Sequence, residues 1–130
     1  MSIALNALNL SRAFISTLAV GIMQRALDEA VAYAKQRKQF GRRLIDFEMV
    51  QQMLADMAIK TEAARVLVNN CMRQMDAGEM VRKDGAIVKT FVTDAMQEVV
   101  SNAVQVLGGY GYSEEYPVEK LMRDAKIFQI

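Results

Sequence analysis

The sequence has no histidine and one cysteine, Cys71, among its 130 residues. Without histidine there can be no Ser-His-Asp or Cys-His catalytic group, no histidine proton shuttle and none of the usual zinc sites. A single cysteine excludes a disulfide within the chain. Any metal site would have to use carboxylates alone, and we predict none. With one proline and seven glycines, the chain is expected to form long, uninterrupted elements.

The charges nearly cancel, with sixteen basic and fifteen acidic residues. This balance argues against bulk attraction to nucleic acid or to an anionic membrane. Hydrophobic residues make up 52% of the chain, enough for a folded core in one domain over residues 1–130. We see no secretory signal and no apolar run long enough to span a membrane. We therefore expect a soluble protein in a reducing compartment.

Apolar periodicity predicts four helices, at about 11–37, 46–77, 82–107 and 117–128. No stretch alternates with period two, so no sheet is expected. The predicted fold is an all-α antiparallel bundle of three long helices and a short fourth. Gly21, inside the first helix, suggests close approach of another backbone.

The expected inward positions follow spacings of three and four. In the first helix they are Phe14, Leu18, Ile22, Met23, Leu27, Ala30, Val31 and Ala34. In the second they are Val50, Leu54, Met57, Thr61, Ala64, Val68, Cys71 and Met75. In the third they are Val88, Phe91, Val92, Ala95, Val99, Ala103 and Val106.

Two stretches could bind a ligand. Five basic residues fall within nine positions, at Lys35, Arg37, Lys38, Arg42 and Arg43. Guanidinium groups there could hold phosphate oxygens, although charge count alone favours a solvated helix end. The second stretch, 105–112, has three glycines in four positions, which would let backbone N–H groups approach a ligand. A simple loop that ends a helix would look the same.

Arg12 stands near the expected start of the first helix, where a cation is unfavourable for the helix dipole. This placement hints at a specific anion. No pair of carboxylates is placed as a general acid and base, so we predict no catalytic residue in this chain.

Several runs, in order and over essentially the whole chain, resemble the C-terminal domain of the acyl-CoA dehydrogenases. They are Ala26-Leu27-Asp28-Glu29-Ala30, Tyr33-Ala34, Arg37-Lys38-Gln39-Phe40-Gly41, Leu54-Ala55-Asp56-Met57, Glu62-Ala63-Ala64-Arg65, Gln105-Val106-Leu107-Gly108-Gly109-Tyr110-Gly111-Tyr112 and Tyr116-Pro117-Val118-Glu119-Lys120-Leu121-Met122-Arg123-Asp124-Ala125. No single run is decisive, but together they are highly specific.

The resemblance implies an oxidoreductase of fatty acid metabolism that desaturates the Cα–Cβ bond of an acyl-CoA thioester. In this family a glutamate removes the α-proton, FAD accepts the β-hydrogen as hydride, and an electron-transferring flavoprotein takes the electrons. The family forms homo-oligomers, dimers or tetramers, that share FAD across a subunit boundary. Its members occur in bacterial cytoplasm or the mitochondrial matrix.

By position, the resemblance implies FAD contacts in two stretches, both to the ADP half of a partner subunit's FAD. Arg37, Gln39 and Phe40 match one stretch, and Gln105 and Gly109 match the other. Arg12 matches an arginine near the acyl-CoA site.

The chain also departs from the family pattern. The reactive glutamate of many members follows directly after the stretch that matches Phe128–Ile130, so we expect the 130-residue chain to be inactive alone. Asn9 stands where many members have aspartate, and Glu48 where many have glutamine, which puts one FAD contact in doubt. The alternatives are a non-catalytic helical module that binds a nucleotide or a protein and, less favoured, a small nucleic-acid binder.

Overall fold

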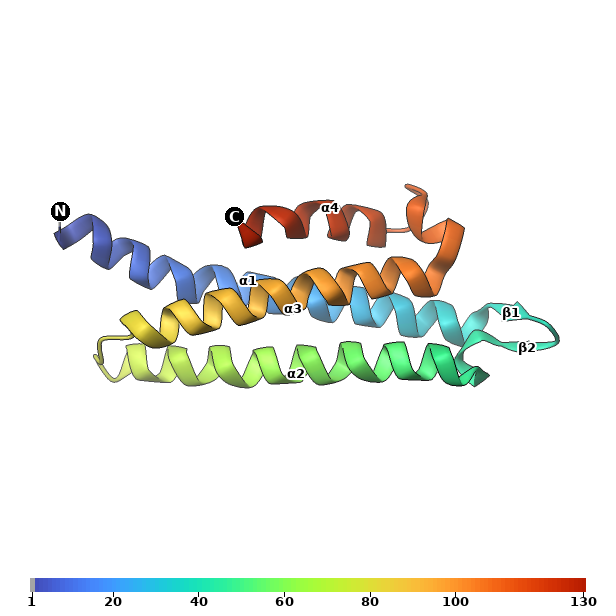
Figure 1. Cartoon of the computed structure of the whole chain (residues 1–130), viewed down its shortest axis with the longest axis horizontal. Helices are drawn as coiled ribbons and strands as arrows, with labels where there is room; N and C mark the ends of the chain where they lie inside the picture. Colours follow the sequence, from blue (N-terminus) through green and yellow to red (C-terminus); the bar gives the residue numbers. More distant parts are fainter. Residues whose placement is uncertain (1) are drawn as a thin grey trace.

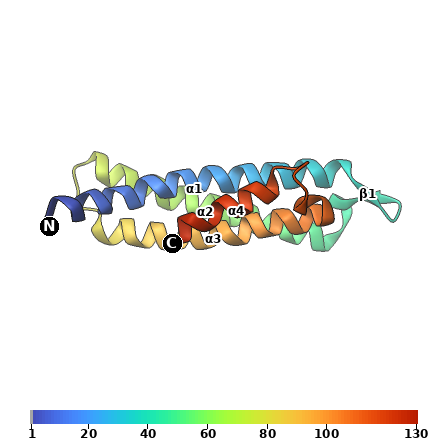
Figure 2. The same cartoon turned by 90° about the horizontal axis from the view of Figure 1, so that it is seen from above.

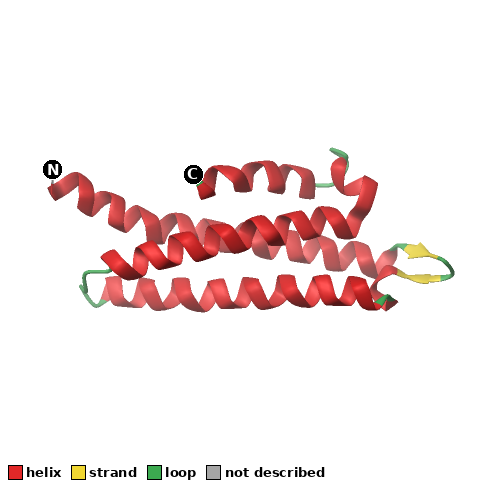
Figure 3. Cartoon of the chain, viewed as in Figure 1, coloured by secondary structure: helices red, strands yellow, loops and turns green. Residues whose placement is uncertain are grey.

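The computed structural model of the chain describes residues 2–130 and is almost entirely helical (Figures 1 and 3). Each of the three long helices runs antiparallel to the one before it, and the short last helix packs over α1 and α3 (Figures 1 and 2). The predicted all-α antiparallel bundle is confirmed. Its elements are α1 (Ser2–Gln36), β1 (Lys38–Gln39), β2 (Arg42–Arg43), the 3-10 turn η1 (Leu44–Asp46), α2 (Glu48–Asp76), α3 (Arg82–Leu107), the 3-10 turn η2 (Gly108–Tyr112) and α4 (Val118–Gln129).

The first helix is longer than predicted, because α1 begins at Ser2 and not near residue 11. The added segment is rich in alanine and leucine, which favour helix without needing an amphipathic pattern. Arg12 therefore lies inside α1, and the helix-dipole argument for an anion at Arg12 was wrong.

The expectation of no sheet was also wrong, because β1 and β2 form a minimal antiparallel hairpin. Its pairs are Lys38 with Arg43 and Gln39 with Arg42. Strands of two residues are too short to show a period-two pattern. The turn residues Phe40 and Gly41 have φ of 51° and 81°, and two consecutive positive φ values are typical of the tight hairpin turn whose twist matches the strands.

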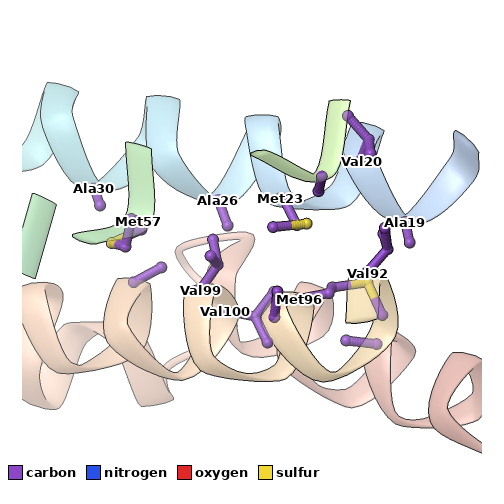
Figure 4. Packing of buried hydrophobic residues seen from close by; sticks show 14 of the residues in the cluster. Ala19, Val20, Met23, Ala26, Ala30, Met57, Val92, Met96, Val99 and Val100 are labelled. Atoms are coloured by element: carbon purple, nitrogen blue, oxygen red, sulfur yellow. The ribbon is translucent and has the colours of Figure 1, made fainter. Parts of the chain in front are cut away.

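The inward face of α1 is built from small residues (Figure 4). Phe14 and Leu18, expected inside, are 54% and 63% exposed, and Phe91 of α3 is 40% exposed. Both faces of α1 are apolar, so periodicity did not distinguish them. The buried residues of α1 are Ala13, Ser16, Ala19, Val20, Met23, Ala26, Ala30 and Ala34.

The seam of α2, meaning its line of inward-facing apolar residues, lies where the residue spacing predicted it. Six of its eight predicted positions are buried: Leu54, Met57, Thr61, Ala64, Val68 and Cys71. Val50 and Met75 are partly buried against the same core. Burial raises the pKa of the Cys71 thiol, which disfavours its nucleophilic thiolate form.

Polar contacts tie the helices together at a few points. Lys60 of α2 pairs with Asp56 on its own helix and with Glu98 of α3. Lys89 of α3 donates to the main-chain carbonyl of Gln129, 3.1 Å away, at the end of α4. The Gln129 amide in turn donates to Asp94 of α3 at 2.6 Å. The last turn of α4 is thereby fixed to α3 by its main chain and its side chain.

Contrary to our expectation from the sequence, the described residues include one helix, Ile3–Gln36 of α1, long and apolar enough to cross a membrane by length and composition alone. Core helices of soluble bundles pass the same test. In this structure α1 packs along α2, α3 and α4.

The helical glycines provide a test of the packing. A methyl group added at Gly21 meets nothing within 4 Å among the described residues, so the predicted close backbone approach at Gly21 was wrong. Gly21→Ala should raise the free energy of unfolding by about 1 kcal/mol, since alanine favours helix over glycine by that amount. Gly85→Ala is the matched control, because its added methyl lies 3.3 Å from the Asn9 carbonyl oxygen and should gain less.

Urea unfolding followed by circular dichroism measures both changes. A lower stability for Gly21→Ala would contradict the open position described above.

Candidate functional site

The C-terminal ends of α1 and α3 lie at the hairpin end of the bundle (Figures 1 and 2). Residues at these two ends line a cleft of about 730 Å³. This volume is within the range of small-molecule sites. Its lining residues are Tyr33, Arg37, Gln39, Leu44, Val106, Leu107, Gly108, Gly109, Tyr110, Ser113 and Glu115. The end of α1 with the hairpin and the end of α3 with η2 thus contribute two opposing walls.

Arg37 lies at the junction between α1 and the hairpin. Its N–H donates to the Tyr33 carbonyl at 2.9 Å, which continues the helical pattern by one residue. Its carbonyl accepts a hydrogen bond from the Leu44 N–H at 2.8 Å, which closes the hairpin. The half-buried Arg37 side chain is the only basic group in the lining of this cleft.

The glycine-rich wall has two glycines with opposite surroundings. A methyl group at Gly111 would lie 2.6 Å from the carbonyl oxygen of Val104, so Gly111 permits the loop to fold onto the last turns of α3. A methyl group at Gly109 would meet nothing within 4 Å among the described residues. Gly111 therefore serves the fold, whereas Gly109 leaves open space on the cleft side.

The cleft brings together three of the residues predicted for FAD. Arg37, Gln39 and Gly109 line it. Gln105 is exposed on the last turn of α3 and Phe40 is 93% exposed at the hairpin tip, and neither lines the cleft. Arg12 lies twenty-five residues before Arg37 on α1, about 37 Å away at 1.5 Å per residue, so it belongs to a different region.

The five-residue basic cluster is not one binding surface. Arg43 pairs with Asp46 at 2.9 Å, and the hydrogen bond from Arg43 lowers the pKa of the Asp46 carboxyl. The Arg42 guanidinium lies 3.9 Å from the centre of the Phe47 ring. Lys35 lines a separate groove between α1 and α2. Within the cluster only Arg37 lines the large cleft.

Tyr33 and Glu115 also line the cleft but were not candidates from the sequence. Tyr33 precedes Arg37 by one helical turn, so its side chain lies on the same face of α1. The four-residue spacing from Arg37 would have indicated Tyr33 as a candidate. Glu115, the one acidic residue of the lining, is exposed on the loop after η2 and carries no such signal. Among residues 2–130 no group of three or more potential metal ligands occurs.

The surroundings of Gly111 and Gly109 predict effects of different size on stability. Gly111→Ala should lower the free energy of unfolding by about 2 kcal/mol, because the new methyl group overlaps a main-chain oxygen that cannot move independently. Gly109→Ala is the matched control and should leave the unfolding free energy nearly unchanged. Urea unfolding measures both. Equal effects of the two substitutions would contradict the different roles assigned to these glycines.

Comparison with known proteins agrees with this architecture. The family model described as "Acyl-CoA dehydrogenase, C-terminal domain" matches residues 1–130. A probable acyl-CoA dehydrogenase from Mycobacterium bovis is 49% identical over 98% of this chain and 33% of its own length. The caffeyl-CoA reductase–Etf complex subunit CarC of Acetobacterium woodii is 43% identical over 98% of this chain and 34% of its own length.

The fold agrees with a solved structure as well. Butyryl-CoA dehydrogenase from Megasphaera elsdenii superposes with a TM-score of 0.97 at 46% identity, over 99% of this chain and 34% of that one. The chain thus spans about a third of the length of the relatives it matches. By sequence, by fold and over its whole length, this chain belongs to the acyl-CoA dehydrogenase family, as a C-terminal domain.

Proposed function

We propose that this chain is the C-terminal part of an FAD-dependent acyl-CoA dehydrogenase and that its cleft holds the ADP half of FAD. The observation that carries the proposal is the meeting of Arg37 and Gln39 with Gly109 in one cleft. These residues come from two stretches that lie far apart in the sequence. Each stretch independently resembled a family contact to the same half of the cofactor.

The cleft fits this group in volume, shape and charge. Its volume suits a nucleotide, and the open space at Gly109 admits a ligand close to the main chain. Arg37 supplies a guanidinium that can donate to phosphate oxygens, which are strong charge-assisted acceptors. The exposed side chain of Glu115 opposes an anion only weakly, because water screens it.

In this proposal each residue has a binding task. Arg37 donates to the diphosphate, the Gln39 amide donates or accepts at the nucleotide, and Gly109 lets the main chain approach it. The flavin of FAD, when bound, supplies the hydride acceptor. This domain orients the far end of the cofactor and covers it from water.

Phe40 and Gln105 are proposed to contact the cofactor from outside this cleft. Phe40 keeps a positive φ and an almost fully exposed ring, both unfavourable for phenylalanine in an isolated chain. An aromatic ring presented in this way is suited to a ligand or surface that another subunit brings. Gln105 lies on the adjoining last turn of α3.

Arg12 is proposed to face the acyl-CoA substrate. Its guanidinium donates to the Asn9 side-chain oxygen at 3.0 Å. Because asparagine is neutral, this contact orients Arg12 without cancelling its charge. The charge remains available for an anionic group such as those of coenzyme A.

The proposal includes partners and a compartment. We expect a homo-oligomer that shares FAD between subunits, with an electron-transferring flavoprotein as electron acceptor. One relative carries Etf in the name of its complex, which supports the second partner. The relatives compared above are bacterial, which supports a bacterial cytoplasm over a mitochondrial matrix.

Nucleotide binding tests the cleft directly. Isothermal titration of this chain with ADP should show binding, and Arg37→Gln should weaken it about tenfold or more, since a hydrogen bond to a charged group contributes about 1.5–3 kcal/mol. Arg25→Gln removes the same charge from an exposed position on α1 and should bind ADP like the wild type. Equal affinities for all three proteins would refute the proposed site.

Catalysis tests the expectation that the 130-residue chain is inactive alone. The 130-residue chain, mixed with FAD and butyryl-CoA, should not bleach the flavin absorbance. No carboxylate of this chain is assigned as a base, and the cleft is proposed to hold the ADP half of the cofactor, away from the flavin. A full-length acyl-CoA dehydrogenase serves as the positive control. Bleaching by the 130-residue chain at a comparable rate would show that it contains its own catalytic base.

A further inference from the structure

Three tyrosines form a closed aromatic cluster beside the cleft. Tyr33 comes from α1, Tyr110 from η2, and Tyr116 from the loop before α4. The ring centres are 6.4 Å apart for Tyr33 and Tyr110, 5.5 Å for Tyr33 and Tyr116, and 5.9 Å for Tyr110 and Tyr116. Two of the three pairs meet edge to face, an arrangement that aromatic pairs prefer. Each ring is therefore held by the other two.

Arg37 lies against this cluster. Its guanidinium carbon is 5.4 Å from the centre of the Tyr110 ring, within the range of a cation–π contact. In the part of the chain that the structure describes, the ion pairs join other basic residues and none includes Arg37. Burial raises the pKa of the Tyr33 hydroxyl, and the nearby charge of Arg37 partly offsets that rise.

The cluster also separates two hollows. Tyr33, Arg37 and Tyr110 line both the large cleft and a smaller hollow of about 280 Å³ that Tyr116 borders. Arginine is long and flexible, so without a restraint its head could turn to either side. The face of the Tyr110 ring provides that restraint.

We propose that Tyr110, held by Tyr33 and Tyr116, is a positioning residue that aims Arg37 into the cleft without neutralising its charge. A carboxylate partner would restrain Arg37 equally well but would cancel the charge that a phosphate needs. An aromatic face restrains the guanidinium and leaves it cationic. The rotamer entropy is then lost on folding and not on ligand binding, which favours affinity. The ligand part of this inference rests on the function proposed above.

Three substitutions test the role of the ring. Tyr110→Leu removes the aromatic face and should weaken ADP binding about threefold, the size of an exposed cation–π contact. Tyr110→Phe keeps the face and should restore near wild-type affinity. Tyr112→Leu is the matched control on the same turn, since Tyr112 is 80% exposed and outside the cluster. Tyr110→Gln replaces the leucine variant if circular dichroism shows that the latter does not fold.

The effect should depend on Arg37. In an Arg37→Gln background, Tyr110→Leu should cause no further loss of ADP affinity. An equal threefold loss in both backgrounds would mean that the ring contacts the nucleotide itself, and the positioning role would be overturned. Failure of Tyr110→Phe to restore affinity would overturn it as well, by pointing to the hydroxyl group.

A double-mutant cycle on stability, measured without ligand, separates this inference from the proposed function. Urea unfolding of the wild type, Arg37→Gln, Tyr110→Leu and the double variant should show a coupling of about threefold in the unfolding equilibrium constant. Additive effects would overturn the contact between Arg37 and Tyr110. If the wild type fails to bind ADP while the coupling is present, the nucleotide site is refuted and the positioning of Arg37 is upheld.

Discussion

The arrangement of the whole domain depends on the close packing of α1 against α3. The most extensive contact between helices joins these two, and α1 contributes mainly alanines to it, including Ala19, Ala26 and Ala30 (Figure 4). Small side chains let the helix backbones approach, while Val99 and Met96 of α3 fill the remaining space. Since the two helices run in the same direction, their C-terminal ends meet at one end of the bundle (Figure 1). The cleft is formed by these two ends and the turns that follow them.

The number and order of the helices could be predicted because Gly41, Gly78, Gly108 and Pro117 interrupt an otherwise helical sequence at its three connections. The inward face could be predicted only where the opposite face is polar. The seam of α2 met that condition. On α1 large apolar residues such as Phe14 and Leu18 lie opposite the alanine stripe, and both faces read as apolar. Hydrophobic periodicity favours the face of α1 with the larger side chains, whereas close packing against α3 requires the face with the small side chains.

The candidate site also has features that could be predicted from the sequence and features that could not. The family resemblance predicted five cofactor contacts, and three of these residues, Arg37, Gln39 and Gly109, line one cleft. The tyrosine cluster could not be predicted, because Tyr33 and Tyr110 come from elements far apart in the sequence. Nor could the sequence show that Arg42 stacks on Phe47, away from the cleft. A run of basic residues in the sequence shows only that the charges are close along the chain. The fold decides which of them share a surface.

The arginines of this region show how the fold assigns different tasks to one residue type. Arg43 is paired with Asp46 across three residues, an exposed contact that contributes little stability but occupies its charge. Arg37 is restrained by an aromatic ring, and its charge is left without a carboxylate partner among the ion pairs of the described chain. A binding site for an anion needs a cation that is fixed in direction and still unneutralised. Of the two ways of holding an arginine seen here, only the aromatic one meets both conditions.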